Sequence, residues 1–258
     1  MINKVAIIQA RMGSTRLPGK VLRKINNVPL LKFQIDRINQ SKLIGQTIVA
    51  TSNSENDNLI VEFCKANGIA CFRGSEDDVL DRYYRCAKKY KADIIIRLCA
   101  DNPLIDPIII DKVIQFYQDS EVDYAANGIP PETNRYPDGS DLEVFSMETL
   151  ERTHLEADDP HDREHVTFYI WKYDHGFTLA QLQQETDWSK YRFTVDYFED
   201  FEVVEYVIQE LNKRNSFGHL NEIVEIIEAN PEIKNKNAHY YYGIGWEQRK
   251  KVFNKIPQ

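Results

Sequence analysis

Short apolar segments alternate with amphipathic segments through the first 120 residues of this chain, and this alternation restricts the fold more than any other feature. The apolar runs predict four strands, at residues 5–9, 47–50, 70–73 and 93–98. Helical periodicity predicts four helices, at residues 30–41, 56–67, 79–90 and 107–119. Strands that alternate with helices build a mostly parallel sheet flanked by helices, so we expect an α/β fold.

The first predicted strand passes directly into a loop that combines glycine, hydroxyl and basic residues. Gly13 and Gly19 permit sharp backbone turns, and Arg11, Arg16 and Lys20 supply positive charge. The loop is neither a Walker P-loop, because it lacks Gly-Lys-Ser/Thr, nor a dinucleotide-binding G-x-G-x-x-G loop. An ordinary basic surface loop is the alternative, but such loops rarely concentrate these residues. We therefore expect this loop to bind a polyphosphate through backbone N–H groups and cations.

The overall charge and the cysteines limit the class of protein. A net charge of -8 in 258 residues argues against a general binder of nucleic acids or anionic membranes, because both use broad basic surfaces. No apolar run approaches membrane-spanning length. The four cysteines lack metal-ligand spacing, so we expect free thiols and a cytoplasmic protein.

The regular alternation stops after residue 122. Residues 123–186 contain prolines and short segments, and we expect them to form an inserted subdomain for substrate binding or dimerisation. Its predicted elements are a strand at 142–145 and helices at 147–157 and 161–171. A core strand at 192–195 and helices at 200–213 and 220–228 are predicted after it.

These elements predict one domain of 258 residues with three parts. The nucleotide-binding core comprises residues 1–122 and 187–230, and the insert comprises residues 123–186. Residues 231–258 form a tail rich in aromatic residues, which we expect to pack on the body of the protein or on a second subunit.

Two aspartates follow predicted strands at the carboxyl edge of the sheet, where this architecture binds ligands. They are Asp101 and Asp196. Mg²⁺ binds few carboxylates directly and takes its other ligands from water and phosphate, so both are candidate metal ligands. Alternatively, Asp101 starts a turn before Pro103 and Asp196 caps the following helix. The phosphate loop nearby favours the metal site.

Six segments in chain order resemble the cytidylyltransferases that make CMP-activated acidic sugars. The resemblance is strongest to the spore coat polysaccharide SpsF-like branch, and it extends to CMP-KDO and acylneuraminate cytidylyltransferases. The segments are QARMGSTRLPGKVL (9–22), RGSEDDVLDRYY (73–84), DNPLID (101–106), YPDG (136–139), REHVT (163–167) and TVDYFEDF (194–201). This resemblance covers residues 4 to about 230, and it implies a Rossmann-like, GT-A-like nucleotidyltransferase fold with a mixed, mostly parallel sheet.

The resemblance also implies an activity: transfer of CMP from CTP to a sugar acid or phosphorylated acceptor, with Mg²⁺ as cofactor and a homodimer as assembly. The candidate catalytic residues are Arg16, Lys20, Asp101 and Asp196, of which the two aspartates are the metal ligands. The candidate nucleotide-binding residues are Gln9, Ala10, Arg11, Gly13, Ser14, Arg73, Gly74 and Ser75. The candidate acceptor-binding residues are Arg135, Tyr136, Asp138, Asp141, Glu143, Arg163 and His165.

Some of these assignments have structural alternatives. The alternative role of Arg73 is an ion pair with Glu76 or Asp77. The alternative for His165 is a structural role in the protein interior. Tyr197 and Phe198 occupy positions at which relatives commonly have Thr-Pro. The acceptors of the CMP-KDO and sialic acid enzymes therefore cannot be assigned to this protein.

Two other functions compete with nucleotidyl transfer. A glycosyltransferase that uses a preformed nucleotide sugar predicts a D-x-D metal pair on one loop, and residues 101–103 lack it. A non-catalytic nucleotide-binding protein is the other alternative. The presence of Arg16, Lys20, Asp101 and Asp196 together argues against it.

Overall fold

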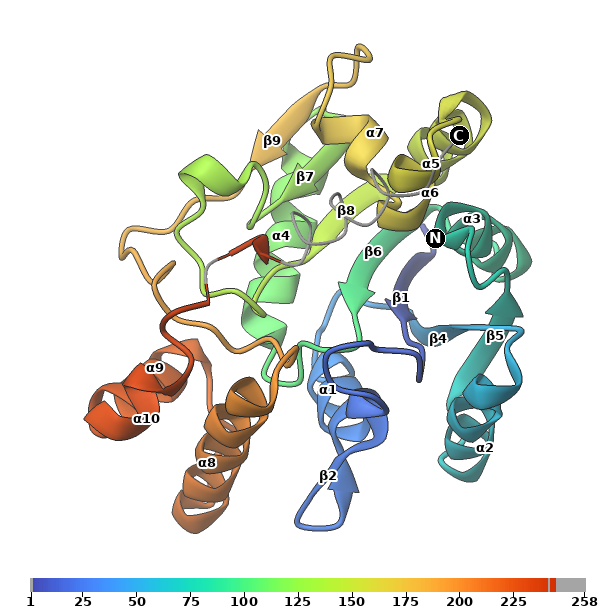
Figure 1. Ribbon diagram of the computed structural model, residues 1–258. Helices are drawn as coiled ribbons and strands as arrows, with labels where there is room; N and C mark the ends of the chain where they lie inside the picture. Colours follow the sequence, from blue (N-terminus) through green and yellow to red (C-terminus); the bar gives the residue numbers. More distant parts are fainter. Residues whose placement is uncertain (1, 241, 245–258) are drawn as a thin grey trace, which may run out of the picture.

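The computed structural model describes residues 2–240 and 242–244, in which a seven-stranded sheet has helices packed on both faces (Figure 1). The sheet order is β5-β4-β1-β6-β8-β7-β9, and β2 and β3 form a separate two-stranded ribbon. The strands are β1 (Lys4–Gln9), β2 (Lys24–Ile25), β3 (Val28–Pro29), β4 (Gln46–Ser52), β5 (Ala70–Gly74), β6 (Ile94–Cys99), β7 (Tyr124–Ala126), β8 (Glu143–Ser146) and β9 (Leu179–Gln181). The predicted α/β fold is confirmed.

The helices are α1 (Leu30–Ile38), α2 (Asn58–Ala66), α3 (Val79–Lys89), α4 (Pro107–Asp119), α5 (Met147–Glu156), α6 (Pro160–His165), α7 (Phe168–Trp171), α8 (Phe198–Arg214), α9 (Leu220–Glu228) and α10 (Pro231–Lys236). Helices α1 to α5, α8 and α9 begin and end close to the predicted residues. Helix α4 starts where expected because Asp106 accepts the N–H of Ile108 and Pro107 occupies the first turn. Among the described residues, no helix is long and apolar enough to span a bilayer.

Strand β1 is apolar on both faces because both faces are covered. Ala6 and Ile8 belong to the core layer beneath α1, α4, α8 and α9, whereas Val5 and Ile7 belong to the layer beneath α3 and α5. Alternating side chains of a strand point to opposite faces, so a strand between two helical layers needs a continuous apolar run. This arrangement accounts for the strong sequence signal of β1.

The sheet changes direction at β6. Strand β6 pairs with β1 in parallel and with β8 in antiparallel, and the carboxyl ends of β1 and β6 lie side by side. Strands β7, β8 and β9, which all come from residues 123–186, extend the same sheet beyond this border (Figure 1). The strand order also reverses between β1 and β6, because β4 and β5 lie on one side of β1 and β6 lies on the other. Crevices at the carboxyl ends of strands at such a point are the usual ligand sites of α/β folds.

Two predictions about secondary structure were wrong. Residues 192–195 form no strand, and their pairing is limited to a single bridge between Asp138 and Arg192. These residues are apolar because Phe193 and Val195 are buried in the core. The backbone N–H of Val195 donates to the carbonyl of Asp101. The helix predicted at 161–171 is divided into α6 and α7, because Val166 has a positive φ of 65°.

Gly139 is the position at which a side chain is least tolerable. Its φ is +96°, and a Cβ atom there would lie 2.2 Å from the backbone N of Thr194. We expect Gly139→Ala to lower the free energy of unfolding by about 3 kcal/mol or more, because the clash adds to backbone strain. Gly68 also has a positive φ, but its Cβ would meet open space, so Gly68→Ala should cost only about 1 kcal/mol. Urea unfolding of both variants checks this prediction, and equal losses would contradict it.

Candidate active site

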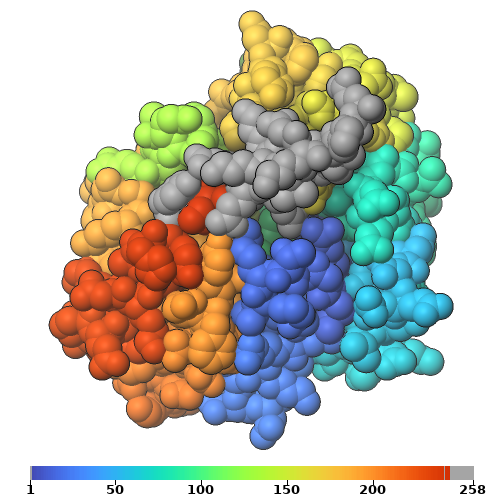
Figure 2. Space-filling view, viewed as in Figure 1, coloured from blue at the N-terminus to red at the C-terminus, as the bar shows by residue number. Residues whose placement is uncertain are grey.

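A cavity of about 210 Å³ opens at the carboxyl ends of β1 and β6. The loop after β1, helices α3, α6 and α7, and the segment around residue 194 contribute to its lining. On the face shown in Figure 2, the blue residues of the first loop adjoin the orange residues that precede and form α8. The cavity therefore lies where the sheet changes from parallel to antiparallel pairing.

The four predicted catalytic residues meet in this cavity. The Lys20 ammonium lies 2.7 Å from Oδ2 of Asp101 and 2.8 Å from Oδ1 of Asp196. The guanidinium of Arg16 lies 2.6 Å from the same Oδ1 of Asp196. The chain thus brings three distant segments onto one cluster of two cations and two carboxylates.

The charges of this cluster support one another. Burial disfavours the ammonium of Lys20, but Asp101 and Asp196 outweigh burial and raise the pKa of Lys20. Burial likewise opposes ionisation of Asp196, but Lys20 and Arg16 outweigh it and hold the pKa of this carboxyl well below its usual range. Lys20 and Asp196 are therefore both charged at neutral pH.

Arg192, which was not among the predicted site residues, orients this cluster through its carboxylates. It is buried and contacts three carboxylates, those of Asp138, Asp196 (3.1 Å) and Asp200 (3.0 Å). Asp200 also accepts the backbone N–H of Asp196 at 2.9 Å, at the start of α8. An arginine four residues before Asp196 in an apolar segment is the signal that could have revealed it.

The loop after β1 is held in shape by Asp57. Its Oδ1 accepts the N–H of Met12 at 2.7 Å, and its Oδ2 accepts the hydroxyl of Ser52 at 2.5 Å. Burial opposes ionisation of Asp57, but these hydrogen bonds outweigh it and lower the pKa of the carboxyl. Gly19, with a φ of +69°, closes the loop by donating its N–H to the carbonyl of Met12. The loop is thus formed before any ligand binds.

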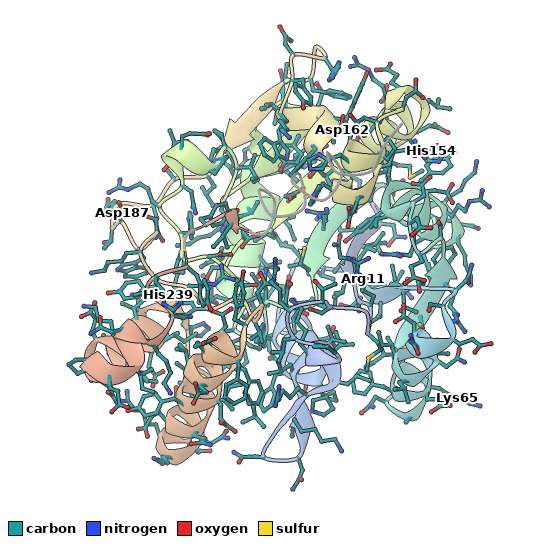
Figure 3. All side chains as sticks on the ribbon, viewed as in Figure 1. Arg11, Lys65, His154, Asp162, Asp187 and His239 are labelled. Carbon is teal, nitrogen blue, oxygen red and sulfur yellow. The ribbon has the colours of Figure 1, made fainter. Side chains whose placement is uncertain are left out.

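The structure divides the predicted nucleotide-binding residues into two groups. Gln9, Ala10, Arg11 and Ser14 line the cavity, and Gly13 lies in the same loop outside the lining. In Figure 3, Arg11 lies near the middle of the view, whereas Lys65 lies at its edge. Arg73, Gly74 and Ser75 do not line the cavity.

In the structure, residues 73–75 contact other parts of the protein. Arg73 donates to the carbonyls of Ser52 and Ser54, and so it fastens the turn after β4 instead of meeting Glu76 or Asp77. Nearby, Arg82 of α3 lines the cavity and donates to the carbonyl of Ser75 at 2.6 Å. A Cβ at Gly74 would lie 2.9 Å from Cγ of Arg82, so Gly74 gives this arginine room.

The predicted acceptor-binding residues also divide. Those that line the cavity are Asp138, Asp141, Glu143 and His165, and His165 is also stacked on Phe168. Arg135, Tyr136 and Arg163 do not line it. Arg135 donates to the carbonyl of Glu185, Tyr136 is buried in the core, and Arg163 holds Asp78 of the α3 cap at 2.9 Å. In the structure, these three side chains contact other parts of the protein.

Part of the aromatic tail packs on the body of the protein. Tyr240 stacks on Tyr197 with ring centroids 4.0 Å apart, and the guanidinium of Arg16 lies 5.2 Å from the Tyr197 ring. Tyr242 and Gly243 line the cavity. Residues 241 and 245–258 lie outside the described residues, so the contacts of the remaining tail stay a prediction.

The donor chemistry of Asp101 and Asp196 fits a hard cation. Their oxygens converge on the single point that the Lys20 ammonium occupies, and Mg²⁺ needs few protein carboxylates. Within residues 2–240 and 242–244, no three His, Cys, Asp or Glu side chains group to hold a metal by themselves. A metal here would take its remaining ligands from water and substrate, and Mg²⁺ itself stays a prediction.

Asp141 makes stability depend on pH. Burial, with Glu143 and Asp101 nearby, raises the pKa of Asp141 to about 6. A carboxyl with a raised pKa stabilises the folded state fully below its ordinary pKa, and this contribution is lost as pH rises through 6. Between pH 4 and 7 we expect the wild type to lose on the order of 2 kcal/mol relative to Asp141→Asn, which cannot ionise. Urea unfolding of both proteins across this range measures the difference, and a constant difference would contradict it.

The comparisons with known proteins agree with this geometry. Residues 5–250 match the family model described as cytidylyltransferase. The chain is 34% identical to the spore coat polysaccharide biosynthesis protein SpsF of Bacillus subtilis, over 88% of the chain and 94% of that protein. It is 35% identical to a 3-deoxy-manno-octulosonate cytidylyltransferase of Geobacter metallireducens, over 42% of each chain.

Among solved structures, a cytidylyltransferase from Leptospira borgpetersenii superimposes with a TM-score of 0.84 and 33% identity, covering 94% of this chain and 100% of that one. Family model, full-length relative and solved structure thus agree along nearly the whole chain. The chain belongs to the cytidylyltransferase family.

Proposed function

We propose that this cytidylyltransferase transfers CMP from CTP to a hydroxyl of a sugar acid used in a cell-surface polysaccharide, with release of pyrophosphate. The observation that carries the proposal is the cluster of Arg16, Lys20, Asp101 and Asp196 beside the preformed glycine loop. The names of the similar proteins support it, since one belongs to spore coat polysaccharide biosynthesis and another is a 3-deoxy-manno-octulosonate cytidylyltransferase.

The barrier to this reaction is largely electrostatic. An acceptor hydroxyl must approach the α-phosphorus of a highly charged triphosphate, and negative charge develops on the leaving pyrophosphate. Arg16 and Lys20 would neutralise that charge, and the partial burial of both side chains would strengthen their effect. Asp101 and Asp196 would hold Mg²⁺, which supplies further charge neutralisation at the phosphates when bound.

The remaining cavity residues then fall into a nucleotide part and an acceptor part. Gln9, Ala10, Arg11 and Ser14, together with Arg82 in place of Arg73, would contact the nucleotide from the loop and from α3. Asp138, Asp141, Glu143 and His165 would contact the acceptor. Arg192 acts through Asp196 and Asp138, and is a positioning residue.

The assembly and the compartment remain proposals. All four cysteines are free thiols in the structure, as predicted, and free thiols fit a reducing cytoplasm. A homodimer is implied by the family resemblance. Because Tyr240 stacks on Tyr197, part of the tail packs on the body of the same chain.

Pyrophosphate release tests the reaction directly. We expect release with CTP and Mg²⁺ in the presence of one sugar acid from a panel of nonulosonic acids, KDO-type acids and sugar phosphates. Parallel reactions with ATP, GTP and UTP should stay near background, and chelation by EDTA should abolish release until Mg²⁺ is restored. Tight CTP binding without release on any acceptor would favour a non-catalytic nucleotide-binding protein.

Lys20→Ala should reduce kcat by about 10² or more, because the ammonium contacts both aspartates and would stabilise charge that develops in the transition state. Lys24→Ala is a matched control, since Lys24 is an exposed lysine of β2 in the same region. Circular dichroism should show both variants folded. If Lys20→Ala raises only the KM for CTP, the residue contributes uniform binding and not catalysis.

A further inference from the structure

Arg97 is an anomaly in the central sheet. It interrupts the apolar strand β6, whose other members are Ile94, Ile95, Ile96, Leu98 and Cys99. Its side chain is only 11% exposed, and it lines the cavity at the border between the parallel and antiparallel halves of the sheet. A cation is expensive to bury, so its presence on a central strand requires an explanation.

The hydrogen bonds of Arg97 do not use all five N–H donors of its guanidinium. Nη1 lies 2.5 Å from Oε1 of Glu143 on β8, and Nη2 donates to Oε1 of Gln9 on β1 at 3.1 Å. Nε is buried and has no hydrogen-bond partner among the described residues. Burial opposes the charge of Arg97, but Glu143 outweighs it and raises the pKa, so the guanidinium remains charged.

The other cations of the cavity are engaged elsewhere. Arg16, Lys20 and Arg192 all contact Asp196. Arg11 and Arg82 belong to the first loop and to α3, on the nucleotide side. Of the cavity cations in the part of the chain that the structure describes, Arg97 is the one carried by a strand of the central sheet.

We propose that Arg97 binds the carboxylate of the acceptor, and that Glu143 and Gln9 orient its guanidinium for this contact. The proposal rests on the proposed function and specifies the acceptor as a carboxylic acid. A guanidinium matches the planar geometry of a carboxylate. Since Glu143 already provides one negative charge, a monoanionic carboxylate is accepted more readily than a dianionic phosphate.

A purely structural role is the competing explanation. Arg97 and Glu143 are directly opposite each other in the β6–β8 pairing, and an ion pair there would simply fasten the two strands. That role predicts a loss of stability on mutation, with no change in preference between an acid and its neutral analogue. The two explanations therefore differ in a measurable ratio.

The experiment measures binding to the CTP-loaded protein by saturation-transfer NMR. The probes are 3-deoxy-manno-octulosonate and N-acetylneuraminate, each compared with its own carboxamide. We expect the wild type to bind at least one acid about tenfold or more tightly than the amide, because a charged hydrogen-bond pair is lost in the amide. Arg97→Lys should reduce this ratio, and the double variant Arg97→Met/Glu143→Met should bring it near one.

The double variant removes both charges and leaves no unpaired buried ion, so we expect it to fold. Arg97→Lys, which keeps the charge but loses the planar fork, decides the question if the double variant does not fold. Arg73→Met is the matched control, because Arg73 is an arginine that hydrogen-bonds backbone carbonyls outside the cavity. It should retain the wild-type ratio of acid to amide affinity.

Three results would overturn the proposal. They are a wild type that binds acid and amide equally, a wild type that binds neither acid, and an unchanged ratio in Arg97→Lys. A lowered thermal midpoint with an unchanged ratio would assign Arg97 to strand pairing instead. Selective binding of an acid without pyrophosphate release would overturn the proposed function while leaving the carboxylate site standing.

Discussion

The Lys20 ammonium, held between Asp101 and Asp196, is the interaction on which the rest of the site depends. Each partner comes from a different part of the chain, and Lys20 and Asp196 are 176 residues apart in sequence. A buried cation is stable only when its partners are fixed, so the loop after β1, the end of β6 and the segment before α8 must all be held in place.

The supporting contacts fix each of those segments. Asp57 holds the loop through Met12 and Ser52, and the carbonyl of Asp101 accepts the N–H of Val195. Arg192 and Asp200 fix Asp196 through its side chain and its backbone N–H. Contacts within the protein therefore fix the charged groups of the site, which is the condition for electrostatic catalysis without a large reorganisation of the protein.

The two halves of the sheet give the cavity two kinds of surface. The parallel half presents a loop rich in N–H groups and cations, which suits a triphosphate. The antiparallel half, built from residues 123–186, presents Glu143 and Asp141 beside Arg97. Because β6 belongs to both halves, it brings Arg97 and, just beyond its end, Asp101 to the same cavity.

The sequence by itself determined the α/β fold, the strand and loop at residues 4–20, and the candidate role of Arg16, Lys20, Asp101 and Asp196, because glycines, basic residues and aspartates that follow apolar runs leave local signals. Only the tertiary structure decided that Arg82 and not Arg73 lines the cavity, and that residues 192–195 are buried without forming a strand. It also decided that Arg97 meets Glu143. The physical reason is that a long side chain goes to the partner that satisfies its hydrogen bonds, and those partners come from distant segments that only folding brings together.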